Sequence, residues 1–238
     1  MKIRQKIIGS LIALGAFGTL LGPGCADNRS SIFIIGAMAV PQDTCVVEAT
    51  NNAETRFAGR LDTALSREYW IPVLVGNQLV RRGNAATLRT ETSHVSFYEA
   101  EVNLTDSAGA AIANGNFVVP VTGFAEAAQG VDPGLGVAAI TLIDPTSAQS
   151  ITPGQIIANI ILRGETLGGV EVETDSWAFP ITVCNGCSIF FPGDADDPAR
   201  PGVDCDIRDD APAYCRLGMD EAVDCRSCSA LNAALCRP

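Results

Sequence analysis

The sequence predicts a mainly β protein: an immunoglobulin-like β-sandwich followed by a disulfide-rich C-terminal tail that contains one short helix. Three observations lead to this prediction. Short apolar runs separated by turn residues recur through residues 32–183 at even spacing, which is typical of sandwiches. Seven of the nine cysteines lie beyond residue 183. An apolar segment behind a basic N-terminus indicates export to a compartment in which disulfides form.

Residues 1–24 have the pattern of a signal peptide, with a basic start and an uncharged apolar run over 7–22. That run is short and rich in Gly and Ala for a membrane-spanning helix. Small residues then lead directly to Cys25, and this junction resembles the lipobox of bacterial lipoproteins, although Leu21 stands one position early. The resemblance implies that Cys25 becomes the first mature residue and carries acyl chains. Plain secretion and an uncleaved anchor are the alternatives.

Residues 25–31 are polar and form a short tether between the lipid and the folded body. No Asp directly follows Cys25, so the inner-membrane retention signal known in some lipoproteins is absent and the outer membrane is the expected location. Each buried CH₂ of an acyl chain contributes about 0.8 kcal/mol, so two or more chains make attachment effectively permanent. The domain would face either the periplasm or the cell exterior.

The body over 32–183 is expected to contain eight strands. The run QIIANIILRG is also compatible with a helix because it is continuously apolar, but its isoleucines and the flanking glycines favour a strand. The expected strands cover residues 31–40, 44–49, 69–75, 94–104, 117–124, 136–143, 155–164 and 177–184.

Two patterns refine this prediction. In the strand over 94–104, Val95 and Phe97 share one phase of the alternation, whereas the apolar residues from Ala100 onward share the other. Such a phase change within one strand is typical of a β-bulge. The strand over 177–184 alternates without interruption, so its apolar residues should face the core. These residues are Trp177, Phe179, Ile181 and Val183.

Three prolines interrupt the predicted strands at Pro72, Pro120 and Pro180. Proline has no N–H to donate to a β-ladder. Each of the three is therefore expected at an edge position or at a bulge.

Eight cysteines remain when Cys25 is set aside, and an even number in an exported chain predicts four disulfides. Eight cysteines allow 105 pairings, and the sequence does not choose among them. The expected disulfide residues are Cys45, Cys184, Cys187, Cys205, Cys215, Cys225, Cys228 and Cys236.

The motifs CNGC (184–187) and CRSC (225–228) also match half-sites for zinc. The gap between them is long for a zinc ribbon, and three tail cysteines would be left over. A redox role requires the first cysteine at a helix N-terminus, where the pKa of the thiol falls, but CNGC ends a β-branched run. Disulfides are therefore the favoured interpretation, and no metal is assigned.

The tail predicts a helix over 219–236, with two acids in its first turn. The segment before it has too few apolar residues for a core, so bridges of about 2–4 kcal/mol each are expected to replace one. At 100° per residue, one side of the helix would carry Cys225, Cys228, Leu231, Leu235 and Cys236.

Charge excludes some partners. After removal of residues 1–24 the chain has 13 arginines and 27 acidic residues, a net charge of 13 − 27 = −14. The phosphate backbone of a nucleic acid would repel such a chain. An anionic membrane surface would also repel the body if the body lay flat against it. The adjacent basic residues Arg81 and Arg82 are expected in a solvated loop.

Few residues point to catalysis or metal binding. His94 is the one histidine and begins a predicted strand, and no G-x-S-x-G motif accompanies it. Glu99 and Glu101 point the same way on one strand, where a solvated surface is favoured over a cation site. The acidic segment 193–206 fails the EF-hand pattern, which leaves an irregular calcium site as the alternative. Its ligands would be Asp194, Asp196 and Asp197.

The order of parts, with VCNGC followed by AVDCRSC, resembles uncharacterised cysteine-rich surface lipoproteins of Gram-negative bacteria. That family lends no catalytic residue. The resemblance implies a non-enzymatic, membrane-anchored binding or structural module that needs no cofactor. Its partners would be the membrane, through the lipid anchor, and other envelope proteins or surface ligands. An envelope hydrolase using His94 and a metal-binding tail are the alternative functions.

Overall fold

The computed structural model describes residues 31–192, 196–197, 200–203, 205–206 and 211–236. The expected signal peptide, the predicted lipidation site Cys25 and all of the expected tether except Ser31 lie outside the described residues. No helix within these ranges is long and apolar enough to cross a membrane.

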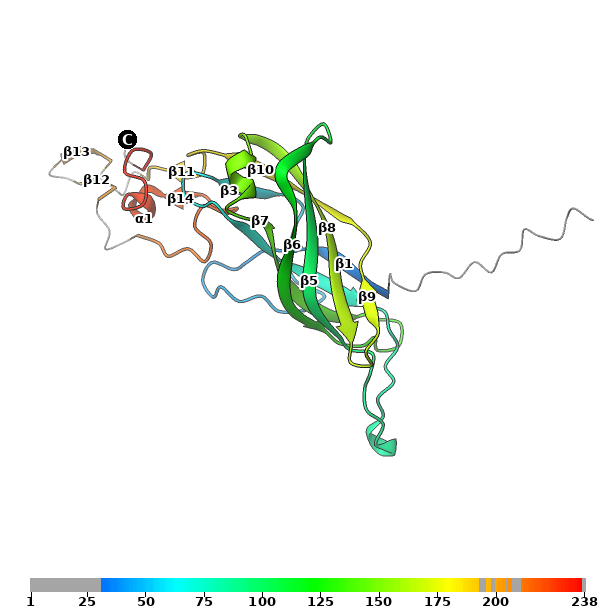
Figure 1. Cartoon of the computed structure of the whole chain (residues 1–238). Coiled ribbons are helices and arrows are strands. Elements are labelled where there is room, and N and C mark those ends of the chain that lie inside the picture. The colour runs from blue at the N-terminus through cyan, green and yellow to red at the C-terminus, as the bar shows by residue number, and fades with distance from the viewer. Residues whose placement is uncertain (1–30, 193–195, 198–199, 204, 207–210, 237–238) are drawn as a thin grey trace, which may run out of the picture.

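The body is one ten-stranded sheet (Figure 1). Its strands are β1 (Ile32–Met38), β2 (Thr55–Arg56), β3 (Gly59–Asp62), β4 (Tyr69–Asn77), β5 (Val95–Asp106), β6 (Ala111–Ala125), β7 (Gly134–Ile143), β8 (Gly154–Thr166), β9 (Glu171–Glu173) and β10 (Trp177–Cys184). They follow the order β2-β1-β4-β7-β6-β5-β8-β10-β3, and β9 pairs with β8. All these pairings are antiparallel except that between β10 and β3.

The sheet curls until its two ends nearly meet. The strands at those ends, β2 and β3, are separated in sequence by only residues 57 and 58. The three residue steps from Arg56 to Gly59 span roughly 11 Å at most, so the link holds the ends of the sheet close to each other. The prediction of a mainly β chain is confirmed, whereas the predicted immunoglobulin-like pair of stacked sheets is replaced by this single, nearly closed sheet.

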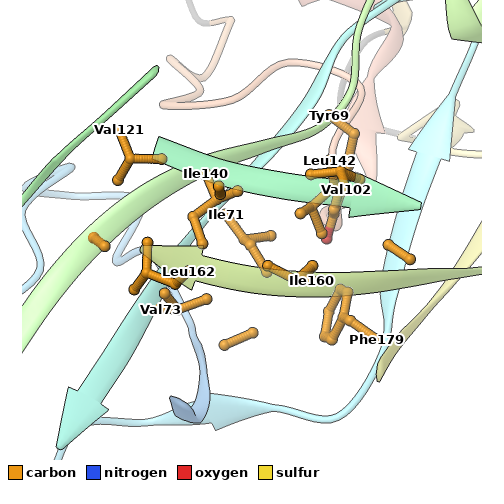
Figure 2. Packing of buried hydrophobic residues seen from close by; sticks show 14 of the residues in the cluster. Tyr69, Ile71, Val73, Val102, Val121, Ile140, Leu142, Ile160, Leu162 and Phe179 are labelled. Atoms are coloured by element: carbon orange, nitrogen blue, oxygen red, sulfur yellow. The ribbon is translucent and has the colours of Figure 1, made fainter. Parts of the chain in front are cut away.

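The core fills the concave side of the sheet. Figure 2 shows side chains from β4, β5, β7, β8 and β10 pointing toward one another, and Phe179, predicted to face inward, is among them. Burying each such side chain contributes about 1.5–3 kcal/mol relative to exposure. The largest fully buried side chains are Tyr69, Phe179, Ile32, Leu61, Ile71, Leu104, Ile140, Leu142, Ile143, Ile160, Leu162 and Ile181.

The predicted bulge in β5 is confirmed. The pairing of β5 with both of its neighbours shifts register between Phe97 and Glu99. Relative to β8, the extra residue of β5 is Tyr98, which is 42% exposed, whereas Phe97 and Ala100 are both buried. A bulge adds local twist and bend, which helps this long central strand to follow the curved sheet.

All three prolines lie where a neighbouring strand is missing or bulged. The pairing between β1 and β4 ends at Val73, the residue next to Pro72, so Pro72 has no partner in β1. Pro120 lies opposite Glu99 at the β5 bulge. Pro180 precedes the first residue of β10 that pairs with β3. The prediction of edge or bulge positions is therefore confirmed.

The predicted strand over 44–49 is wrong, because that segment has no regular secondary structure. Cys45 has a φ of 56°, which lies outside the β region, and its N–H donates to the Pro41 carbonyl oxygen in a turn. Val46, which the strand would have placed in the sheet, is 58% exposed.

The C-terminal region adds small elements at one end of the sheet. These are β11 (Ile189–Phe190), β12 (Asp196–Asp197), β13 (Arg200–Val203), β14 (Val223–Asp224) and α1 (Cys225–Cys228). β11 pairs in parallel with β14, and β12 pairs with β13. Val223, Cys228 and Cys236 form a second small core, against which Leu65, Ile189, Tyr214 and Leu217 pack.

The tail contains one short helix, as predicted, but the expected helix over 219–236 is wrong in extent. α1 has four residues and begins after Asp224, whose side chain accepts a hydrogen bond from the Arg226 N–H. Asp220 has a φ of 64° and does not belong to a first helical turn. The expected apolar side of the helix is also absent, since Leu231 is 64% exposed.

Candidate functional site

Four disulfides fix the C-terminal region. Their pairs are Cys45–Cys215, Cys184–Cys187, Cys205–Cys225 and Cys228–Cys236. The first joins the loop after β1 to the C-terminal region across 170 residues of sequence, and the other three lie within that region. These bridges use all eight of the cysteines predicted to pair, and they indicate an oxidising compartment.

Asp62, at the end of β3, shapes the CNGC loop. It is completely buried. One carboxylate oxygen accepts hydrogen bonds from the N–H groups of Ala64 at 3.0 Å and Gly186 at 2.6 Å, and the other accepts from the Ser188 N–H at 2.8 Å. Hydrogen bonds to a charged acceptor are the stronger kind, so this carboxylate holds residues 185–188 against the end of β3.

The same carboxylate and the two sulfurs of Cys184 and Cys187 lie within 4.8 Å of one another, a spacing that would suit a metal ion. The two sulfurs are bonded to each other, so neither is a thiolate, the form in which cysteine binds metals. The two CxxC motifs also do not converge on a zinc site, because Cys225 and Cys228 are bridged to Cys205 and Cys236. The oxidised protein therefore offers no sulfur ligand at either motif.

Asp220 attaches the C-terminal region to β3 and β4. Its Oδ1 accepts from the Arg60 N–H at 2.9 Å and from the Tyr69 hydroxyl at 2.8 Å. Its Oδ2 accepts from the guanidinium of Arg216 at 2.5 Å, and both of these side chains are 1% exposed. Arg216 also donates to the Trp70 carbonyl oxygen at 2.7 Å, and its Cζ lies 5.2 Å from the centre of that indole ring.

Burial raises the pKa of Tyr69 far above its ordinary value, and the charge of Asp220 raises it further. The phenol therefore stays protonated and serves as a hydrogen-bond donor. The Tyr69 hydroxyl and both oxygens of the Asp220 carboxylate are engaged in hydrogen bonds within this cluster, so the cluster is suited to fixing the C-terminal region. Sequence reasoning missed Asp62, Tyr69, Arg216 and Asp220.

Glu99 and Glu101 lie on β5, as predicted, and both form ion pairs with the side chain of one arginine, Arg163. Arg163 of β8 donates to Glu99 at 2.9 Å and to Glu101 at 2.8 Å, and it lies 3.5 Å from Glu173. Its side chain is 31% exposed. The guanidinium occupies the position in which a metal ion would have to sit between the two glutamates.

His94 lies just before β5 and serves the neighbouring loop. Its Nδ1 accepts a hydrogen bond from the Ala127 N–H at 3.2 Å, and its ring stacks on Phe124 with centroids 5.1 Å apart. Nδ1 therefore carries no proton, and Nε2 is the nitrogen left for other contacts. The hydrolase hypothesis, which depends on this residue, remains a prediction that His94→Ala would test.

The calcium site in the acidic segment remains a prediction. Asp194 lies outside the described residues. Asp196 and Asp197 form β12, of which the structure gives the backbone pairing with β13.

Arg81 and Arg82 lie in a loop, as predicted, and this loop over residues 78–93 is a long projection between β4 and β5. Figure 1 shows it extending away from the sheet at the end opposite α1. At its tip, the side chain of Asn84 caps a single 3₁₀ turn, Ala85–Thr87, and accepts from the Ala86 N–H at 2.9 Å. Leu88 follows in the left-handed region with a φ of 54°.

Glu91 holds the two arms of this loop together. Its carboxylate accepts hydrogen bonds from the N–H groups of Arg82 and Gly83 on one arm and of Thr92 and Ser93 on the other. Partial burial opposes ionisation, but the four backbone donors outweigh it and lower the pKa of Glu91 to about 2. The glutamate is therefore fully charged at neutral pH.

Comparison of the chain with protein families, with curated proteins and with solved structures finds no match in any of the three.

Proposed function

We propose that the protein is a lipid-anchored, non-enzymatic module of the bacterial cell envelope, tethered through Cys25 at the outer membrane, that binds or organises other envelope components. The observation that carries this proposal is the arithmetic of the cysteines. The chain has nine, and eight form the four disulfides, which leaves Cys25 as the one cysteine outside them. A cysteine at the end of a signal-like segment, with no partner among the others, is the residue expected to carry acyl chains.

The chemistry of the folded part supports a binding or structural role over catalysis. The buried carboxylates Asp62 and Asp220 accept hydrogen bonds that fix loops, and His94 accepts one from a backbone N–H. A net charge of 13 − 27 = −14 for residues 25–238 disfavours nucleic acid as the partner.

Intact mass measurement of the unreduced protein from cell envelopes tests the proposal. We expect a chain that begins at Cys25, carries the added mass of acyl chains and has lost eight hydrogen atoms through oxidation to four disulfides. A chain that begins at Met1, or an N-terminal cysteine without lipid, would refute the anchor.

Detergent phase partition of two variants gives an independent test. Cys25→Ser should move from the detergent phase to the aqueous phase, because it removes the acylated sulfur. Ala26→Ser, a change of similar size at the next residue, should remain in the detergent phase. Cross-linking in intact envelopes then tests the binding role. Recovery of nothing but abundant background proteins would contradict that role.

A further inference from the structure

We propose that the loop over residues 78–93 touches the lipid headgroups of the membrane that anchors the protein, so that the molecule stands end-on against an anionic bilayer surface. This inference rests on the proposed function in one respect, namely that the chain is attached through Cys25. The position of the loop, its length, its charge and its exposed apolar side chains all favour this contact.

The loop and the N-terminal tether leave the body at the same place. The Gln78 N–H, at the base of the loop, donates to the Ser31 carbonyl oxygen at 2.8 Å. Ser31 is the residue at which the tether enters the folded body, one position before β1. An anchor at Cys25 therefore brings the membrane to this end of the molecule, and the disulfide-rich region at the opposite end lies away from it (Figure 1).

The lengths also agree. The six residue steps from Ser31 back to Cys25 reach about 20 Å when fully extended, and the seven steps from Gln78 to Ala85 reach at most about 25 Å. The loop is thus as long as the tether, and its tip can touch the plane in which the acyl chains enter the bilayer.

Positive charge is concentrated in this loop, whereas the rest of the chain is acidic. Residues 78–93 contain three arginines and one glutamate, a net charge of +2, so the remainder of residues 25–238 carries −14 − 2 = −16. The three arginines, Arg81, Arg82 and Arg89, are all exposed, although Arg81 lies 3.8 Å from Glu91. Anionic headgroups attract basic residues within a Debye length. The acidic body is repelled by the same surface, so the two forces together favour an end-on orientation.

Apolar side chains accompany the arginines. Leu88, at the tip, is 92% exposed, and Val80 is 70% exposed. Val131 is 99% exposed on the adjacent loop, which bonds to this one through Val80 and Ala128. That adjacent loop also carries the acids Glu126 and Asp132, but it joins at the base of the projection and not at its tip. Arginines beside exposed aliphatic side chains suit the boundary between headgroups and acyl chains.

Tryptic cleavage on vesicles tests this orientation, since the loop arginines are themselves cleavage sites. The unreduced chain from Cys25 onward is coupled through that thiol to a maleimide-lipid, so the attachment does not depend on acylation in the cell. One set of vesicles contains phosphatidylcholine alone, and the other adds phosphatidylglycerol. We expect cleavage after Arg89 to slow on the order of tenfold or more on the anionic vesicles. Cleavage after Arg67, which is exposed near the opposite end, should stay unchanged.

Variants separate the two forces. Leu88→Ser and the pair Arg81→Gln with Arg82→Gln keep the Arg89 site, and each should restore most of the cleavage. Phe57→Ser is the matched control, because Phe57 is 89% exposed but lies beside β2, at the other end of β1 from Ser31. Equal cleavage after Arg89 on both kinds of vesicle would overturn the proposal. Loss of acylation at Cys25 in cells would refute the anchor and leave this measurement unaffected.

Discussion

Single buried charges hold the C-terminal region in place, and Asp220 is the clearest case. Its carboxylate neutralises Arg216 where both side chains are 1% exposed. A buried ion pair contributes little more to stability than a well-packed apolar pair. Removing one partner, however, leaves the other charge buried without a counter-charge. We expect Asp220→Asn to destabilise the fold by about 3–5 kcal/mol in urea unfolding. Asparagine tolerates the φ of 64° at this position, so the effect reports the lost charge and not backbone strain.

The surface pair between Arg163 and Glu101 provides the control for this prediction. Its side chains are 31% and 36% exposed. Solvent screens such pairs, so Glu101→Gln should cost less than about 1 kcal/mol. An equal loss of unfolding free energy from the two substitutions would show that burial does not strengthen the interactions of Asp220.

The residues of this cluster also mark the limit of what the sequence predicts. The Tyr69 hydroxyl and Asp220 are 151 positions apart, and Asp62 bonds to Ser188 across 126. No local pattern distinguishes these aspartates from the many exposed acids of the chain. The cysteines were found because their chemistry requires a partner, whereas which sulfurs pair depends on the fold.

At the scale of elements, the projecting loop depends on one glutamate. Glu91 has a pKa of about 2 in the folded protein against 4.5 ordinarily, so ionisation and the closed loop stabilise each other. Because the folded pKa is the lower one, this contribution is complete above about pH 4.5 and is lost as the pH falls toward 2. Amide hydrogen exchange at Gly83 and Ser93 should therefore lose protection below pH 4.5.

The variant Glu91→Gln should show the same loss of protection at neutral pH, since the amide keeps the shape but not the charge. Glu126→Gln, which removes an exposed carboxylate at the same end of the sheet, should leave both amides protected. Protection that stays constant from pH 6 to pH 3 in the unaltered protein would contradict this role for Glu91.

Elements with a strong internal pattern were predictable, and those without one were not. The phase change around Tyr98 predicted the β5 bulge, and proline chemistry predicted where the ladders end. The segment 44–49 looks like a strand by composition, but the left-handed φ of Cys45 prevents it. β3 was missed because its four residues GRLD show no alternation, and its pairing with β10 joins segments about 120 residues apart.

At the scale of the whole molecule, the short strands β2 and β3 decide between a sandwich and a single closed sheet. The eight strands that the sequence predicts, with turns between them, fit two stacked sheets equally well. The choice is made by β2 and β3, which lie at the two ends of the sheet and are joined by two residues. Such short strands leave almost no trace in composition, so the closing of the sheet could not be predicted from the sequence.

The four disulfides should contribute unequally to the stability of the whole chain. In the chain-entropy model a bridge stabilises by restricting the unfolded chain, and the effect grows with the logarithm of the loop it closes. Cys45–Cys215 closes a separation of 170 residues, and Cys184–Cys187 closes one of 3. The model gives about 5 kcal/mol for the first and about 2 kcal/mol for the second. Replacing both cysteines of each bridge by serine should therefore lower the thermal midpoint more for the long bridge.

This comparison controls for chemistry, since each double variant exchanges two sulfurs for two hydroxyls and each bridge has an exposed cysteine, Cys45 or Cys187. The long bridge also ties the loop after β1 to the region that Asp220 holds, so its loss should weaken both attachments together. Thermal unfolding without reductant, followed by circular dichroism, measures the two midpoints. A larger loss from the Cys184 and Cys187 variant would mean that the short bridge acts through the Asp62 loop in the native state and not through the unfolded chain.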